Sequence, residues 1–266
     1  MDFAFEIASA SDVGTERREN EDHCAYLTES PTVGVVVIAD GVSGLAGGGT
    51  ASRRAVESTV RAYRALDHLR PARRLHRAVQ QANIDVYDLA VVVPELRGMA
   101  TTLTAVVIDR GALVAAHVGD CRIYLARGGR MRQITRDHTV VAEKIRLGLL
   151  SEERARESPD RSVLTRSVGR DLIAAIDRIA TTVLQDDRLI LCSDGLHNVL
   201  GPLEMEAIVR DKDAASACRA LIDAANARGT PDNLTAAVVR MIGATPHHRP
   251  GGGLRARLRR LVGRDR

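Results

Sequence analysis

The sequence predicts an α+β fold in which antiparallel sheets are covered by helices. Apolar stretches typical of strands occur in runs, two long segments with helical spacing interrupt those runs, and the chain shows no regular strand–helix–strand alternation. With 266 residues, 45% of them hydrophobic, the chain can bury a sizeable core as one domain. We expect this domain to span residues 1–242 and a flexible Gly- and Arg-rich tail to span residues 243–266.

Three strands and two helices are expected in the first part of the chain. Apolar stretches predict strands at residues 4–9, 23–28 and 33–39, the last β-branched enough to be buried. Apolar positions then recur at helical spacing from residue 50 to about residue 90, and Pro71 divides this region into two helices.

Strands return in the second part of the chain. Three strands joined by hairpin-type dipeptides, Arg110-Gly111 and Gly119-Asp120, predict an antiparallel meander over residues 101–109, 112–118 and 121–126. Residues 137–171 are charged and irregular, with helical parts. The remaining elements are a helix at residues 213–227 and strands at residues 188–192 and 234–241.

Composition argues against several classes of function. Aromatic residues make up 2% of the chain and Trp is absent, which leaves few platforms for stacking bases, so no nucleic-acid partner is expected. The four Cys show no CxxC pairing, which argues against a disulfide framework or a thiolate zinc site. The sequence shows no signal-peptide pattern and no apolar run of membrane-spanning length. A cytoplasmic protein with reduced thiols is the expectation.

The basic character of the chain belongs to its tail. The formal charge is +4, but the last 20 residues hold seven Arg and one Asp, which leaves about −2 for the rest. Apolar tail residues at helical spacing predict a short amphipathic helix that contacts an anionic membrane surface or an acidic partner: Leu254, Leu258, Leu261 and Val262. A disordered basic tail is the alternative, and catalysis should not require it.

Acidic residues recur beside the predicted strands, all but Asp22 directly next to Gly or Asn: Asp22, Asp40, Asp120, Asp194 and Asp232. A single Asp-Gly is usually a turn. Several aspartates brought together by folding can instead supply the oxygen ligands that Mg²⁺ and Mn²⁺ prefer. The glycine-rich run at residues 44–49 lacks a GKS or GKT ending, so we expect no nucleotide P-loop.

Eight segments in order carry a family resemblance from Ser11 to about Arg240. They are Ser11–Asp22, Ile38–Val42 with Gly47-Gly48, Gly98–Leu103, Val118–Arg122, Thr135–Thr139, Leu164–Gly169, Leu191–Leu196, and Gly229–Thr235. In these segments the chain resembles the type 2C protein phosphatases, the metal-dependent PPM phosphatases, in their compact bacterial form.

This resemblance implies a central β-sandwich of two antiparallel sheets flanked by helical pairs. It also implies hydrolysis of phosphoserine and phosphothreonine in phosphorylated proteins, opposing a bacterial Ser/Thr kinase. The cofactors would be two Mn²⁺ or Mg²⁺ ions that activate a water molecule, with a weaker third ion in many bacterial members.

The resemblance also assigns metal ligands. It implies that Asp40 bridges two ions, that the Gly41 carbonyl binds one of them, and that Asp194 and Asp232 complete the other site. Asp22 would act from the outer shell, through bound water.

Four further residues receive an interpretation. Asp120 is similar to the aspartate that binds the third ion together with Asp194, or is a simple turn residue. Arg17 matches the phosphate-binding arginine, whose planar fork suits phosphate oxygens, whereas Arg18 is interpreted as a solvated charge. Glu21 is either a structural acceptor or a ligand-shell residue.

One departure from the family pattern concerns the general acid. The family usually has a histidine where this chain has Leu45, which cannot donate a proton to the leaving group. The alternatives are a slow enzyme, protonation by cation-bound water, or another histidine, with His197 ahead of His23 and His138.

Two other functions stay open. Leu45 favours a catalytically weak module that binds phosphorylated partners, and clustered aspartates also serve metal-dependent phosphodiesterases. Residues 140–171 correspond to a variable flap that selects substrates, or form a solvated helix face.

Overall fold

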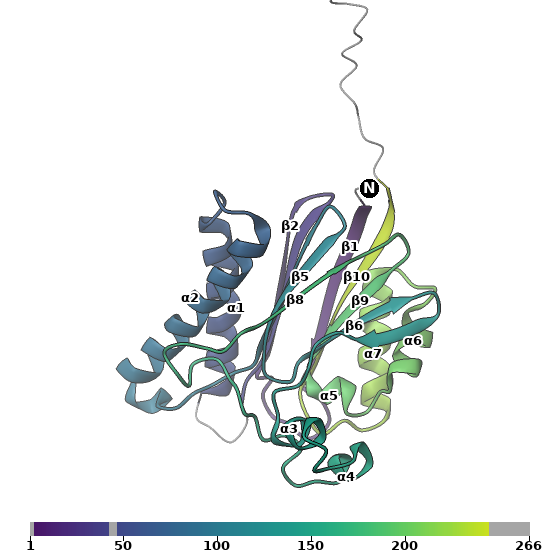
Figure 1. Cartoon of the computed structure of the whole chain (residues 1–266). Coiled ribbons are helices and arrows are strands. Elements are labelled where there is room, and N and C mark those ends of the chain that lie inside the picture. The colour runs from purple at the N-terminus through teal and green to yellow at the C-terminus, as the bar shows by residue number, and fades with distance from the viewer. Residues whose placement is uncertain (1–2, 43–46, 245–266) are drawn as a thin grey trace, which may run out of the picture.

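Two five-stranded antiparallel sheets pack face to face in the computed structural model, which describes residues 3–42 and 47–244 (Figure 1). The first sheet has the order β1-β10-β9-β6-β7, with strands Phe3–Asp12, Leu234–Ala244, Arg188–Cys192, Arg122–Arg127 and Arg130–Gln133. The second has the order β2-β3-β4-β5-β8, with strands Asp22–Ser30, Val33–Asp40, Leu103–Asp109, Ala112–Val118 and Asp177–Thr182.

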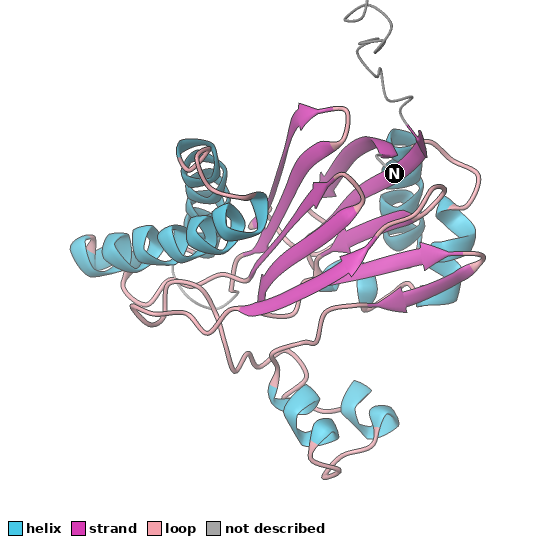
Figure 2. Ribbon diagram, turned by 45° about the horizontal axis from the view of Figure 1, so that its top comes forward, coloured by secondary structure: helices cyan, strands magenta, loops and turns pink. Residues whose placement is uncertain are grey.

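Helices cover the outer face of each sheet. The pair α1 and α2 (Gly48–Ala65 and Pro71–Val92) lies on the second sheet, and α6 and α7 (Pro202–Val209 and Ala214–Ala227) lie on the first. Three short helices, α3 (Val140–Arg146), α4 (Glu152–Arg156) and α5 (Asp194–His197), lie at one end of the sandwich, and α3 and α4 extend away from the sheets (Figure 2). None of the described helices is both long and apolar enough to cross a membrane.

The strands read as continuous apolar runs because both of their faces are buried. Along β3, Val35, Val37 and Ala39 pack against α1 and α2. The alternate residues Val36 and Ile38 pack between the two sheets. Since side chains alternate across a strand, one bulky run supplies two of the three apolar layers. The third layer lies under α5, α6 and α7.

The predicted fold class is confirmed, and so is the division of the first helical region at Pro71, which begins α2. The predicted meander is wrong at its third strand. The Arg110-Gly111 turn does join two paired strands, β4 and β5, but β6 pairs with β7 and β9 in the other sheet. The Gly119-Asp120 turn is therefore a crossing between sheets and not a hairpin.

Two strands were missed by the sequence prediction. Both β7 and β8 are edge strands, and half of their side chains or more carry charge or a polar group. Edge strands are commonly short and charged because one side has no ladder partner, so they lack the apolar run that predicted the central strands. Residues 245–266 lie outside the described residues, and the predicted tail stays a prediction.

Candidate metal centre

Five predicted aspartates meet at one end of the sandwich. Asp22 begins β2 and Asp40 ends β3, and the two residues face each other across the paired strands. Asp194 follows β9, Asp232 precedes β10, and Asp120 lies where the chain crosses between sheets. Burial raises the pKa of Asp40 well above its usual value, and the negative charges of the other four raise it further. All five carboxylates therefore form one cluster.

Thr101 and Thr102 hold the main chain at Asp40. Thr102 Oγ1 accepts the Asp40 N–H at 2.9 Å, and Thr101 Oγ1 donates to the Asp40 carbonyl oxygen at 2.7 Å. The next residue, Gly41, packs so closely on Gly48 that a Cβ would lie 2.4 Å from the Gly48 carbonyl carbon, so only glycine permits this approach. The sequence pattern includes both threonines but assigns them no role, which only their contacts reveal.

Asp22 is a buried carboxylate with one oxygen left unpaired. The residue is 4% exposed, and its Oδ2 accepts the Ser193 hydroxyl at 2.6 Å, which ties the ends of the two sheets together. Its Oδ1 has no hydrogen-bond partner among the described residues. A buried carboxylate oxygen without a donor is costly. A cation, or water around a cation, would satisfy it. Ser193 had no predicted role.

The Asp194 segment packs directly on the Asp232 segment. A Cβ at Gly195 would lie 2.1 Å from the Asn233 carbonyl oxygen, so a side chain there would push the two segments apart. Thr230 Oγ1 also donates to the Gly195 carbonyl oxygen at 2.8 Å. Burial and then the charge of Asp232 raise the pKa of Asp194 to about 6, as expected for neighbouring carboxylates.

Arg17 reaches this cluster from the loop between β1 and β2. Its Nη2 donates to Oδ2 of Asp232 at 2.9 Å, and its side chain is 36% exposed, so the guanidinium lies on the solvent side of the cluster. Asn233 holds the loop, because its Nδ2 donates to the carbonyl oxygens of Val13 and Glu19, both at 2.9 Å. The structure thus brings Arg17 to the carboxylates, and its phosphate-binding role stays a prediction.

Two neighbours of Arg17 differ from it. Arg18 is exposed, which agrees with its interpretation as a solvated charge. Glu21 accepts the Gly49 N–H at 3.1 Å through Oε1, at the start of α1, and its own N–H donates to Asn233 Oδ1 at 2.8 Å. These contacts favour the structural interpretation of Glu21.

The electrostatics of the cluster fit divalent cations. Burial raises the pKa of Asp22 to about 7, and burial followed by the charge of Asp194 raises the pKa of Asp120 well above its usual value. Crowded carboxylates of this kind resist ionisation together, and hard oxygen ligands suit Mg²⁺ or Mn²⁺. Within residues 3–42 and 47–244, no group of three or more Asp, Glu, His or Cys side chains is arranged so that it could hold a metal ion by itself. This is compatible with Mg²⁺-type binding, which keeps several waters.

These raised pKa values predict how pH affects the cation-free protein. Between about pH 4 and about pH 7, the folded state binds more protons on Asp22 and Asp194 than the unfolded chain does, so the free energy of unfolding falls as pH rises through this window. We expect the Tm of EDTA-treated protein to fall by several degrees from about pH 5 to about pH 7.5. Saturating Mn²⁺ should reduce that fall, and parallel Tm curves with and without Mn²⁺ would contradict the prediction.

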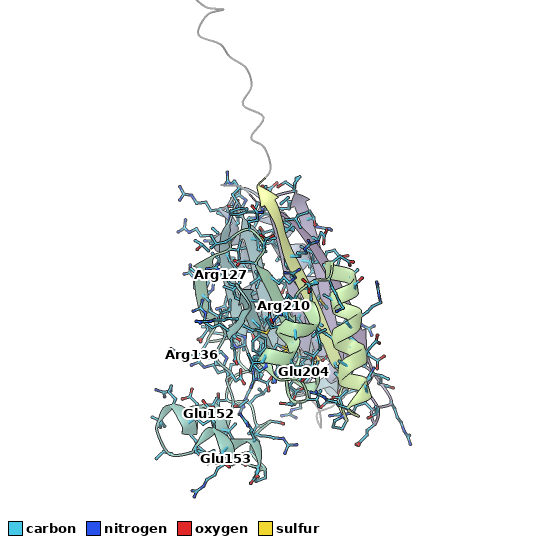
Figure 3. The ribbon with its side chains drawn as sticks, turned by 90° about the vertical axis from the view of Figure 1, so that its right-hand side faces the viewer. Arg127, Arg136, Glu152, Glu153, Glu204 and Arg210 are labelled. Carbon is cyan, nitrogen blue, oxygen red and sulfur yellow. The ribbon has the colours of Figure 1, made fainter. Side chains whose placement is uncertain are left out.

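A cavity of about 860 Å³ opens beside the cluster. Asp120, Asp194 and Asp232 line it on one side, and Glu152 and Arg156 line it from the flap, which we define as residues 140–171 with α3 and α4. Figure 3 shows Glu152 on α4, below the ends of the sheets. Flap side chains therefore border the space next to the carboxylates, and their role in substrate choice stays a prediction.

The structure bears on the substitute general acids. His197 Nε2 donates to the Asp120 carbonyl oxygen at 3.0 Å, and burial lowers the pKa of His197 to about 3. A neutral imidazole whose N–H is already bonded is a poor proton donor at pH 7, so a structural role is favoured. His23 bonds side chains of α1, and His138 bonds Gly119. Leu45 lies outside the described residues.

Comparison with known proteins decides the family. The family model for protein phosphatase 2C matches residues 15–239, a range that contains Arg17 and the whole aspartate cluster. The chain belongs to the protein phosphatase 2C family. The eight segments in its sequence and the sandwich with two helical layers agree with this membership.

Relatives in this family include bacterial phosphatases of similar length. The serine/threonine phosphatase stp of Listeria innocua is 34% identical over 234 residues, which are 86% of this chain and 93% of that protein. The solved structure of the Mycobacterium tuberculosis serine/threonine phosphatase PstP/Ppp has a TM-score of 0.80 and 30% identity, and covers 90% of this chain and 100% of that one. The PstP catalytic domain with two manganese ions has a TM-score of 0.78 and 28% identity, with 91% and 100% coverage.

Proposed function

We propose that this member of the protein phosphatase 2C family hydrolyses phosphoserine and phosphothreonine in proteins with the help of Mn²⁺ or Mg²⁺. The observation that carries the proposal is the position of Arg17 against Asp232, at the edge of five clustered carboxylates. A phosphate dianion needs a cationic partner, and a guanidinium fork pairs with two of its oxygens. The relatives named serine/threonine phosphatases support the same substrate class.

In this proposal each residue of the cluster has a role that follows from its position. Asp40 and the Gly41 carbonyl, with Asp194 and Asp232, would hold two cations, and Asp22 would bind their water. Thr101 and Thr102 keep the Asp40 main chain in place. The manganese found with the PstP catalytic domain supports the choice of metal.

The third cation is part of the same proposal. Asp120 and Asp194 would hold it together. After burial, the negative charge of Asp194 is the next largest cause of the raised pKa of Asp120, as expected for two carboxylates that lie near each other. The two carboxylates also border one cavity.

The cations would supply chemistry that the side chains of the site do not. When bound, divalent cations supply Lewis-acid activation of water at neutral pH and offset the charge of the phosphate. Arg17 orients the phosphate, and the cavity admits the peptide on the flap side. No side chain in the described part of the chain needs to act as a covalent nucleophile.

Partners and location are also part of the proposal. Phosphorylated proteins are the substrates that a serine/threonine phosphatase implies, and a bacterial Ser/Thr kinase would be the opposing enzyme. A cytoplasmic location is supported by the four Cys, which are free thiols in the structure. Contact of the basic tail with an anionic surface or acidic partner stays a proposal from sequence.

The test is phosphate release from a phosphothreonine peptide by the whole chain with Mn²⁺ and with EDTA, next to a diester substrate. Turnover of the peptide with Mn²⁺, lost in EDTA, is the expected result. Peptide binding without phosphate release would favour the binding module that Leu45 suggests. Preferred cleavage of the diester would favour a phosphodiesterase.

A further inference from the structure

His138 joins the turn that carries Asp120 to the flap. Its backbone N–H donates to the Gly119 carbonyl oxygen at 2.8 Å, and its side-chain Nδ1 accepts the Gly119 N–H at 3.1 Å. The residue directly before Asp120 is thus bonded twice by one histidine. Because Nδ1 is an acceptor here, the proton of the neutral ring lies on Nε2.

The remaining groups of His138 contact Thr165 in the flap and Asp177 beyond it. Its carbonyl oxygen accepts the Thr165 N–H at 2.8 Å, and its Nε2 lies 3.2 Å from Oδ2 of Asp177 in β8. The next residue, Thr139, accepts the Ala142 N–H with its side chain and so begins α3. His138, just before the flap, is therefore bonded to Thr165 inside it.

The turn at Asp120 needs such support because no hydrogen bonds between paired strands hold it. It crosses from β5 in one sheet to β6 in the other, so neither set of strand hydrogen bonds includes it. Gly119 has φ +107, and a Cβ there would lie 2.5 Å from the Thr102 Cβ. On the other side, His197 donates to the Asp120 carbonyl oxygen.

We propose that His138 is a positioning residue for Asp120, which it fixes for cation binding by bonding both main-chain groups of Gly119. This inference rests on the proposed function, since it takes Asp120 as a ligand of the third cation. Removal of a residue that hydrogen-bonds a metal ligand typically lowers metal affinity by about 10–100-fold. His138 acts through Gly119 and does not itself contact the cation or the phosphate.

Two near-isosteric substitutions separate this role from general packing. The amide oxygen of Asn lies near the position of the histidine Nδ1, so His138→Asn keeps an acceptor for the Gly119 N–H. The amide of Gln instead reaches the region of Nε2, so His138→Gln keeps the Asp177 side and loses the Gly119 side. His138→Ala loses both side-chain contacts. The exposed His68→Ala is the matched control.

The experiment is calorimetric titration of the cation-free whole chain with Mn²⁺, together with hydrogen exchange at the Gly119 amide. We expect His138→Ala and His138→Gln to weaken the weakest Mn²⁺ site by about 10–100-fold and to expose the Gly119 amide. His138→Asn and His68→Ala should keep both near wild type, and Asp120→Asn should remove the same site. If His138→Ala fails to fold, the Gln and Asn pair still decides.

The outcomes distinguish this inference from the proposed function. Wild-type Mn²⁺ binding in His138→Gln, with loss of the weakest site in Asp120→Asn, would overturn the role of His138 and leave the function intact. Equal weakening in the Asn and Gln variants would assign His138 to packing alone and would also overturn it. A wild-type chain that binds no Mn²⁺ would overturn the function as well.

Discussion

Replacing Asp40 by Asn should reduce Mn²⁺-dependent phosphate release from a phosphothreonine peptide by about 10³-fold or more. Asn keeps the size of the side chain but removes the charge that two cations are proposed to share. Loss of one preorganised electrostatic group at a reacting centre commonly costs about 10²–10³-fold, and this loss also weakens the hold on the cations that activate water. A fall of 10³-fold corresponds to about 4 kcal/mol of barrier.

Asp88→Asn is the matched control for this prediction. Asp88 is exposed on α2, on the outer face of the sandwich, so removal of its charge should leave turnover unchanged. The Asp40 variant should also gain stability without cations, because burial and four neighbouring carboxylates oppose ionisation at this position. A variant with wild-type turnover would remove Asp40 from the proposed centre.

Arg17→Ala should raise the KM for the phosphothreonine peptide by about 10–100-fold. Hydrogen bonds to charged groups are worth about 1.5–3 kcal/mol, and the fold places the Arg17 guanidinium against the carboxylate cluster through Asp232. Steady-state kinetics at saturating Mn²⁺ measure the effect. Arg17→Lys should recover part of it, since it keeps the charge but loses the planar fork.

Arg18→Ala is the control for Arg17, because it removes an equal charge from the adjacent, exposed position. Its KM should match the wild type. Arg17 also contacts Asp232, so a purely structural role is a distinct outcome: Mn²⁺ affinity would fall while KM at saturating Mn²⁺ stayed unchanged. That result would remove Arg17 from phosphate binding.

The flap offers a less direct way to alter activity. Its residues border the cavity beside Asp194, and Thr165 within it bonds His138. A substrate that contacts the flap would therefore act on the segment that holds the Asp120 turn. A change at His138 could therefore alter turnover through the flap as well as through Asp120. Mn²⁺ binding separates the two effects, so it is the informative measurement for variants of His138.

Much of the site could be predicted from the sequence because its residues lie in local patterns. An aspartate that directly follows a β-branched run, as Asp40 does at the end of β3, is placed at a strand end by the run itself. Pro71 ends one helical pattern and begins the next for an equally local reason. The order of the eight segments then identified the family, and with it the sandwich.

Tertiary structure decided the features that depend on pairing between distant segments. Nothing near Gly119-Asp120 distinguishes a hairpin from a crossing between sheets, because the choice is made by β9, which pairs with β6. Ser193 contacts Asp22 across 171 positions of sequence, so no spacing reveals the bond. The sequence by itself determined which residues carry charge at strand ends. Only packing of the two sheets decided which of those charges meet, and which polar groups hold them, because hydrogen bonds and burial act through space.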